Sequence, residues 1–161
     1  MTWQAKAEID VPWGFDKADS QAFCVTSMLD LNQHLECQAP FDDSKQKTFG
    51  SMCCESGPLD MNVNLEKVGY VCGEPMKINV RVENNSNKAV TVKASLVQKI
   101  TFTHPKVKAE VDELCKNVIK KVDGGGNDTL AHEMKVPVTS PSTLGMVSQC
   151  NVAYFLKVAV S

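Results

Sequence analysis

Seven cysteines and three histidines are the residues of this 161-residue chain whose types could support metal or thiol chemistry. His34 and Cys37 have the spacing of a zinc-ligand pair, and Cys53 or Cys54 could in principle complete the site. Cys53 and Cys54 are adjacent, however, and adjacent strand residues point to opposite faces. Buried or idle thiols are therefore the favoured interpretation of Cys24, Cys37, Cys53, Cys54, Cys72, Cys115 and Cys150.

Nucleophilic catalysis by a cysteine would need a histidine base within reach, and His34, His104 and His132 are available. His132 falls in an alternating segment, where a satisfied, partly buried imidazole is the more common role. No Gly-x-Ser-x-Gly motif occurs, and the glycine run 124–126 lacks the Gly-Lys-[Ser/Thr] ending of a phosphate loop. The run predicts a flexible strand connection. We therefore expect no enzyme, no metal site and no cofactor.

The composition narrows the class of protein further. The chain is 43% hydrophobic, which excludes general disorder, and its net charge of −2 with a single arginine argues against nucleic acid as a partner. No apolar run reaches the roughly 20 residues that span a bilayer, and the first residues lack the apolar stretch of a signal peptide. We expect a cytoplasmic protein with reduced cysteines.

Alternating apolar residues predict a chain built from strands. The opening run 3–9 predicts a strand with one buried face that completes another sheet, and a second apolar stretch covers 22–25. From residue 57 onward the alternation is clearest, and several strands joined by polar turns imply two sheets packed face to face. The alternating runs of this part are 61–65, 76–82, 90–96 continuing loosely to 102, 130–136 and 152–160.

Two segments do not alternate. Residues 33–48 have no steady period and predict an exposed connection. In 106–121 the spacing of Val107, Val111, Leu114 and Val118 is typical of a helix, although part of the segment could also be a strand. Lysines at 106, 108, 120 and 121 form a modest basic cluster, which indicates a solvated face or, more weakly, contact with anionic lipid.

Several segments, in order along the chain, resemble the α-arrestin (arrestin domain-containing) family. The run 3–16 resembles the late strands of an arrestin N-terminal domain, and 67–74 resembles the signature that opens the C-terminal domain. The segments 23–32, 47–59, 82–86 and 140–154 add further matches. The residues that carry the resemblance are Pro12, Trp13, Asp30, Asn32, Cys53, Cys54, Gly57, Pro58, Gly69, Tyr70, Gly73, Glu74, Asn84, Pro141, Ser142, Cys150 and Tyr154.

The resemblance implies an all-β fold, an immunoglobulin-like β-sandwich of the arrestin C-terminal type that is truncated at both ends. Residues 1–35 would be the last strands of an N-terminal-type domain and 36–56 an inter-domain linker. Residues 57–161 would form the C-terminal-type sandwich without its closing strand. The family pattern also favours strands over a helix at 106–121, as a long strand, a turn and another strand.

The function that the resemblance implies is a non-enzymatic adaptor in membrane-protein trafficking and endocytosis. Such an adaptor links cytoplasmic segments of membrane proteins to sorting or ubiquitination machinery, with recruitment from the cytoplasm to the plasma membrane or endosomes. The Pro-Pro-x-Tyr motif that recruits ubiquitin ligases does not occur in this sequence. A reactive cysteine of one redox-linked family member is also missing, because the matching region reads Asn127-Asp128-Thr129.

Two alternatives remain open from the sequence. The strand pattern and the sequons at Asn84 and Asn127 would suit an extracellular immunoglobulin-like binding module, which the odd number of cysteines and the missing signal peptide oppose. A thiol-based redox protein could be built on Cys53-Cys54 or on Cys72, which lies in a glycine-rich turn where exposure would permit reactivity.

Overall fold

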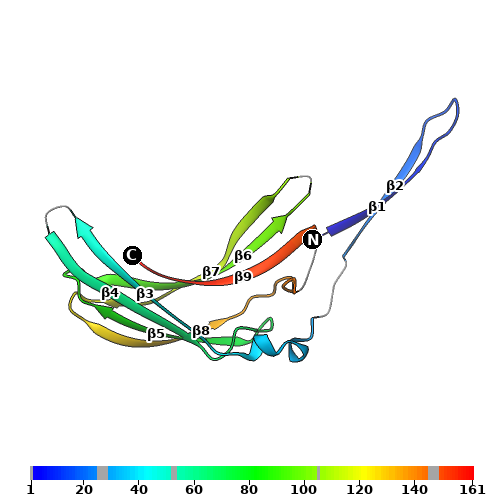
Figure 1. The fold of residues 1–161 in the computed structure, drawn as a ribbon. Coiled ribbons are helices and arrows are strands. Elements are labelled where there is room, and N and C mark those ends of the chain that lie inside the picture. The colour runs from blue at the N-terminus through cyan, green and yellow to red at the C-terminus, as the bar shows by residue number, and fades with distance from the viewer. Residues whose placement is uncertain (1, 25–28, 52–53, 105, 145–148) are drawn as a thin grey trace.

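The computed structural model describes residues 2–24, 29–51, 54–104, 106–144 and 149–161, and these residues are all-β (Figure 1). Two short 3₁₀ helices, η1 (Leu31–Gln33) and η2 (Leu35–Gln38), precede the third strand. The predicted fold class is confirmed, since β3 to β9 form two antiparallel sheets. The strands are β1 (Thr2–Ile9), β2 (Lys17–Cys24), β3 (Phe41–Ser51), β4 (Cys54–Leu65), β5 (Pro75–Asn84), β6 (Val90–Phe102), β7 (Lys108–Val122), β8 (Asn127–Lys135) and β9 (Cys150–Val160).

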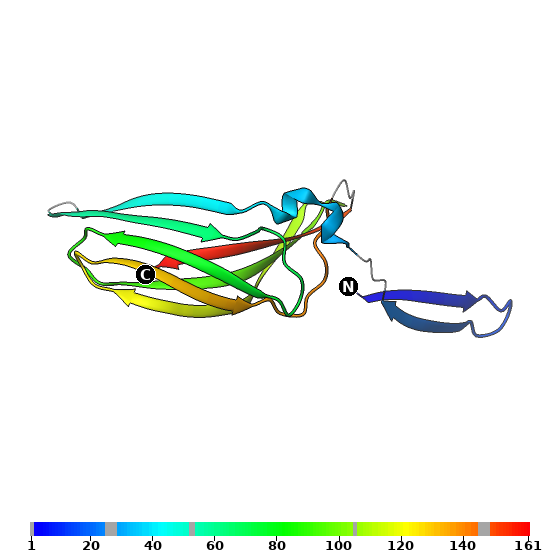
Figure 2. The same ribbon diagram turned by 90° about the horizontal axis from the view of Figure 1, so that it is seen from below.

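A four-stranded sheet in the order β3-β4-β5-β8 packs on a three-stranded sheet in the order β7-β6-β9 (Figure 2). Strict alternation along β5 turns Ile78 and Val80 into the space between the sheets, and both side chains are completely buried. From the facing sheet, Val92 and Ala94 of β6 are also completely buried. Burial of each Val or Ile side chain contributes about 1.5–3 kcal/mol, so this central layer stabilises the packing of the two sheets.

The first two strands form a separate hairpin, with Thr2 opposite Cys24 and Ile9 opposite Lys17, that extends away from the sandwich (Figure 1). We predicted a strand with one buried face at 3–9, and the burial was wrong: Trp3 and Ile9 remain 52% and 64% exposed. The reason is that two strands alone cannot enclose a core. At the hairpin tip, Trp13 has a positive φ of 64° and its side chain is fully exposed.

Residues 33–48 correct a second expectation. We predicted an exposed connection, but η2 and most of β3 lie here, and β3 pairs with β4 from Phe41 opposite Leu65 to Thr48 opposite Pro58. The side chains of residues 41–46 are all exposed, so no apolar alternation marks the strand in the sequence. The segment predicted as a linker, 36–56, therefore contains an edge strand of the sandwich, while the division into domains stays a prediction.

The segment with helical spacing forms one long strand, β7, so the preference for a strand over a helix is confirmed. It is a single strand rather than the expected strand, turn and strand. Its pairing with β6 shifts register twice, between Val92 and Lys93 and between Leu96 and Val97. Each shift adds one residue to β7 and reverses which side chains face the core. The apparent helical stripe combines a core-packed Leu114 with exposed valines.

Asn84, at the end of β5, is completely buried and ties together two turns at one end of the sandwich. Its Nδ2 donates to the carbonyl oxygens of Lys88 at 2.8 Å and Asp123 at 3.0 Å. Its Oδ1 accepts from the hydroxyl of Ser86 at 2.6 Å. Because the amide is enclosed and fully bonded, the Asn84-Asn85-Ser86 sequon is a structural element in this fold and has no room for a glycan.

Candidate functional site

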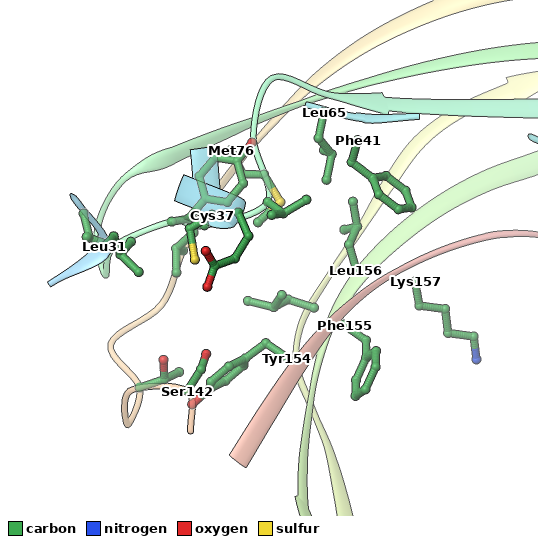
Figure 3. Close-up of a pocket in the computed structure, with 18 of the residues that line it drawn as sticks. Leu31, Cys37, Phe41, Leu65, Met76, Ser142, Tyr154, Phe155, Leu156 and Lys157 are labelled. Carbon is green, nitrogen blue, oxygen red and sulfur yellow. The ribbon is translucent and has the colours of Figure 1, made fainter. Parts of the chain in front are cut away.

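The two sheets separate along one long side of the sandwich and leave a groove of about 840 Å³ (Figure 3). Strands β3 and β4 form one wall and β9 forms the other, while the segments 29–37, 68–72 and 139–144 close one end. We call this space the open-side groove. Apolar side chains from both walls face it, among them Phe41, Met61, Leu65, Met76, Tyr154 and Leu156.

Strand β9 borders the groove with a free backbone edge. Thr91 and Ser161 exchange two backbone hydrogen bonds, of 2.9 and 3.1 Å, and the β6–β9 register continues from this pair without a shift. In an antiparallel pair only alternate residues bond to the partner strand, so Lys157 and Ala159 bond to β6. The N–H and C=O groups of Leu156 and Val158 consequently point to the open side, where no strand of the described chain pairs with β9.

Part of this free edge is occupied by the segment before β9. Thr143 and Val152 bond twice, since the Thr143 N–H donates to the Val152 carbonyl at 2.9 Å and the Val152 N–H donates to Thr143 Oγ1 at 3.1 Å. The Tyr154 hydroxyl donates to the carbonyl of Ser140 at 2.6 Å and accepts from Gln98 Nε2 at 2.6 Å. The available edge therefore begins after Tyr154 and extends to the end of β9.

The turn between β4 and β5 holds an ion pair at the closed end of the groove. Lys67 Nζ lies 2.5 Å from Glu74 Oε1, and the other carboxylate oxygen accepts the Val71 N–H at 3.0 Å. These contacts, Lys67 first, lower the pKa of Glu74. Lys67 also lies 5.2 Å from the ring centre of Tyr70, and burial raises the pKa of the Tyr70 phenol. The Tyr70 hydroxyl is buried and has no hydrogen-bond partner among the described residues.

The 3₁₀ helices bring a second turn to the same end. Asp30 caps η1 by accepting the Asn32 N–H at 3.0 Å, and this hydrogen bond is the main cause of the lowered pKa of Asp30. Cys37 is buried, and its carbonyl accepts the Gly69 N–H at 2.7 Å. A Cβ atom at residue 69 would lie 2.5 Å from Cβ of Cys37, so the close approach of these two turns requires glycine.

The opposite long side of the sandwich is closed by side chains of β7 and β8. Asn117 Nδ2 lies 2.9 Å from His132 Nε2, and Cys115 Sγ lies 3.5 Å from Met134 Sδ. Lys120 pairs with Asp128 further along. The glycine run 124–126 forms the turn between the two strands, so the predicted strand connection is confirmed, although the turn is held by hydrogen bonds and was predicted to be flexible. His132 is thus a satisfied structural histidine.

The structure gathers only some of the predicted motif residues at the groove. Gly69, Tyr70, Pro141, Ser142 and Tyr154 line it directly. Glu74 anchors the turn beside it, Gly73 provides a positive φ of 85° in that turn, and Asp30 with Asn32 caps η1 below it. Cys150 begins β9.

The remaining motif residues lie elsewhere. Pro12 and Trp13 form the hairpin tip, whose turn is closed by the Gly14 N–H donating to the Val11 carbonyl at 2.9 Å. Gly57, Pro58 and Asn84 meet at the end of the sandwich that contains the buried amide network. There a Cβ on Gly57 would lie 2.1 Å from the Asn85 carbonyl oxygen, and the Pro58 carbonyl accepts the Asn85 N–H at 3.0 Å.

Cysteine chemistry receives little support from the described residues. Cys37, Cys72, Cys115 and Cys150 are free thiols. No three metal-binding side chains cluster within the described ranges, which leave out Cys53 and contain only the backbone of Cys54. Cys72 is exposed at the groove rim, as its turn suggested, and its Sγ accepts the Thr139 N–H at 3.4 Å. In the part of the chain that the structure describes, no helix is long and apolar enough to cross a membrane.

Sequence reasoning missed Phe41 and Leu156 as groove residues, and it missed Thr143 as the residue that bonds to part of the β9 edge. The alternation of 152–160 could have identified Leu156, since its side chain shares the core face with Tyr154. Phe41 carried no such signal, because its strand was not recognised. Thr143 forms hydrogen bonds with one edge of β9, and a contact of this kind produces no periodic pattern in the sequence from which it could be predicted.

A family model matches this sandwich. The model is that of the arrestin (or S-antigen) C-terminal domain, and the match covers residues 55–161. The chain belongs to the arrestin family. This confirms the resemblance found in the sequence, and the matched residues begin within β4 and include every later strand.

Curated relatives extend the similarity to nearly the whole chain. Arrestin domain-containing protein 17 of Caenorhabditis elegans is 28% identical over 99% of this chain, and arrestin domain-containing protein 1 of Rattus norvegicus is 28% identical over 98%. Arrestin domain-containing protein 4 of Rattus norvegicus is 28% identical over 86%. The chain spans 39%, 37% and 47% of these relatives, which is less than half of their length.

Proposed function

We propose that this arrestin-family protein is a non-enzymatic adaptor that binds extended cytoplasmic segments of membrane proteins and connects them to sorting or ubiquitination machinery. It would act in the cytoplasm and at the cytoplasmic side of the plasma membrane or endosomes. Family membership supports the class of protein, and the open-side groove supports the kind of ligand.

The observation that carries the ligand proposal is the free edge of β9 beside an apolar groove. An extended peptide can bond to the Leu156 and Val158 backbone as an added strand, which provides affinity without demanding a particular sequence. Every second side chain of such a peptide would enter the groove between Phe41 and Leu156. A ligand with alternating apolar residues therefore fits best.

The test is site-specific photo-crosslinking in cells. A photoreactive phenylalanine analogue at position 41 lies at the groove, and the same analogue at position 133 lies on the exposed outer face of β8 as the matched control. We expect position 41 to crosslink to cytoplasmic segments of membrane proteins, identified by sequencing the linked peptides.

A binding assay with purified protein then tests whether the peptide binds through apolar contacts in the groove. A synthetic peptide copied from a crosslinked segment should bind the unaltered chain, and Leu156→Ala should weaken binding about tenfold through lost apolar contact. Equal crosslinking at positions 41 and 133, or linked peptides drawn only from soluble proteins outside the trafficking and ubiquitin systems, would contradict the proposal.

A further inference from the structure

Strand β3 has a long free edge on the side that faces away from β4. Figure 2 shows β3, in cyan, at the margin of the four-stranded sheet, and no strand of the described chain pairs with its outer side. The strand has 11 residues, and residues 41–48 contain no proline and no shift in their register with β4. Natural edge strands are usually short, bulged or interrupted by proline, because a long regular edge pairs readily with another strand.

The hydrogen bonds of β4 show which of its residues bond to β3. The Asn85 N–H donates to the Pro58 carbonyl at 3.0 Å, and this pair continues the register of β4 with β5. Bonding alternates along an antiparallel strand, so every second residue of β4, counted from Pro58, bonds to β5. The residues between them, which include Met61 and Val63, consequently bond to β3.

The same alternation assigns the backbone groups of β3. Asp43 lies opposite Val63 and Lys45 lies opposite Met61, so the N–H and C=O groups of these two residues point to β4. The N–H and C=O groups of Asp42, Ser44 and Gln46 consequently point outward, to the free edge.

The exposed side chains of this segment place acid before base around a neutral centre. Asp42 and Asp43 precede Ser44, and Lys45 follows it. Within the chain, Lys45 Nζ lies 3.9 Å from Asp43 Oδ2, and the two side chains are 79% and 49% exposed. This ion pair is long and open to solvent, so both groups can still bind a further opposite charge.

A second copy of β3 fits this order of charges in one register. In an antiparallel pair, residues with outward backbone groups must lie opposite each other, so the pair is centred on a residue and not between two residues. A pair centred on Asp43 places two aspartates opposite each other, and a pair centred on Lys45 places two lysines opposite each other. Only the pair centred on Ser44 places each Asp43 opposite a Lys45.

We propose that two copies of this chain pair through β3, antiparallel and centred on Ser44, and join their four-stranded sheets into one. Ser44 would bond to Ser44 of the second copy, and Asp42 would bond to Gln46 of the second copy. Asp43 and the opposing Lys45 would form the closely spaced pair, with Cα atoms about 4.5 Å apart. Opposite charges in this arrangement stabilise strand pairing.

The pairing would also bring two open-side grooves together. Asp43 and Lys45 both line the groove, and residues opposite each other in a sheet share a face. The grooves of the two copies would therefore lie on the same side of the joined sheet, where a ligand with two binding segments gains avidity. This inference goes beyond the proposed adaptor role, and it uses the edge of β3, whereas the ligand proposal uses the edge of β9.

The experiment is sedimentation velocity of the purified full chain without any ligand. We expect a monomer–dimer equilibrium with a dissociation constant of roughly 10–100 µM, because a short edge contact buries little area. Asp43→Lys and Lys45→Asp each place like charges opposite each other, and each should weaken dimerisation roughly 30-fold. An equal mixture of the two variants should recover heterodimers, detected by their mass, because each variant supplies the charge that the other lacks.

The matched control is Lys135→Asp, which makes the same charge change as Lys45→Asp on an exposed position of β8. It should dimerise within about twofold of the unaltered chain. A chain that stays monomeric at 200 µM or so would overturn the proposal, since that exceeds the expected dissociation constant.

Three further outcomes would overturn the proposal as well. Equal losses in Lys45→Asp and Lys135→Asp would show an effect of net charge and not of the β3 edge. Failure of the mixed variants to form heterodimers would exclude the register centred on Ser44. Growth beyond the dimer would indicate that β3 pairs with a different edge. Circular dichroism verifies that each variant is folded.

Discussion

The two long sides of the sandwich differ in how their edge strands are connected. On the closed side a tight turn joins β7 to β8, and pairs such as Asn117 with His132 bridge the two sheets. On the open side β3 and β9 come from distant parts of the sequence, and each is the free edge of its sheet. A short connection thus forces two sheets together, whereas unconnected edges leave space that a ligand can use.

The largest expected difference lies between the central layer and the open side. Ile78→Ala removes a completely buried side chain and should lower the free energy of unfolding by about 4 kcal/mol. Leu156→Ala, in the partly buried wall of the groove, should cost about 1–2 kcal/mol because the site is already open to solvent. Denaturant unfolding followed by circular dichroism measures both, and equal costs would show that the groove is as tightly packed as the core.

A proline pair tests which edge of β9 is free. Ala159→Pro removes an N–H that bonds to β6 and should destabilise the sandwich by about 3 kcal/mol. Val160→Pro removes an N–H that points to the open side, so its cost should stay under about 1 kcal/mol. The same alternation should appear in amide exchange, with Val158 exchanging on the order of 100-fold faster than Lys157. The reverse order would mean that the open side is already paired.

Removal of the buried Asn84 amide tests whether its hydrogen bonds hold together the two turns at this end of the sandwich. Asn84→Ala leaves the carbonyls of Lys88 and Asp123 without their shared donor and should cost about 2 kcal/mol. Asn64→Ala, on the outer face of β4, is the matched control and should change stability by less than about 0.5 kcal/mol. If both variants unfold at the same denaturant concentration, the network does not hold the two turns.

The smallest expected effect concerns pH at the open side. The pKa of Glu74 is lowered in the folded protein, so the Lys67 contact stabilises the fold above the unfolded pKa, near 4.5, and this contribution is lost as pH falls through the lower folded value. Glu74→Gln should therefore lower the unfolding temperature slightly at pH 7 and have no effect at the acidic limit. An identical difference at every pH would indicate lost packing and not lost charge.

Strands were predicted most accurately from the sequence where packing against the core requires apolar residues at every second position. Alternation in β5, and in the first part of β6, follows directly from burial between two sheets, and the order of family segments identified the arrestin fold. Alternation failed to predict β3, whose exposed side chains carry no period, and it wrongly predicted burial in the hairpin, where Trp3 and Ile9 stay exposed. The groove could not be foreseen, because it depends on which strands remain unpaired and on contacts such as Thr143 with Val152.

The exposed hairpin also determines what optical spectroscopy can detect. The two tryptophans of the chain, Trp3 and Trp13, both lie on it, whereas the two tyrosines, Tyr70 and Tyr154, both line the open-side groove. Tryptophan emission therefore reports on the hairpin and is insensitive to melting of the sandwich core. Tyrosine absorbance, in contrast, reports on the groove from its closed end, at Tyr70, and from the β9 wall, at Tyr154, so the hairpin and the sandwich carry separate intrinsic reporters.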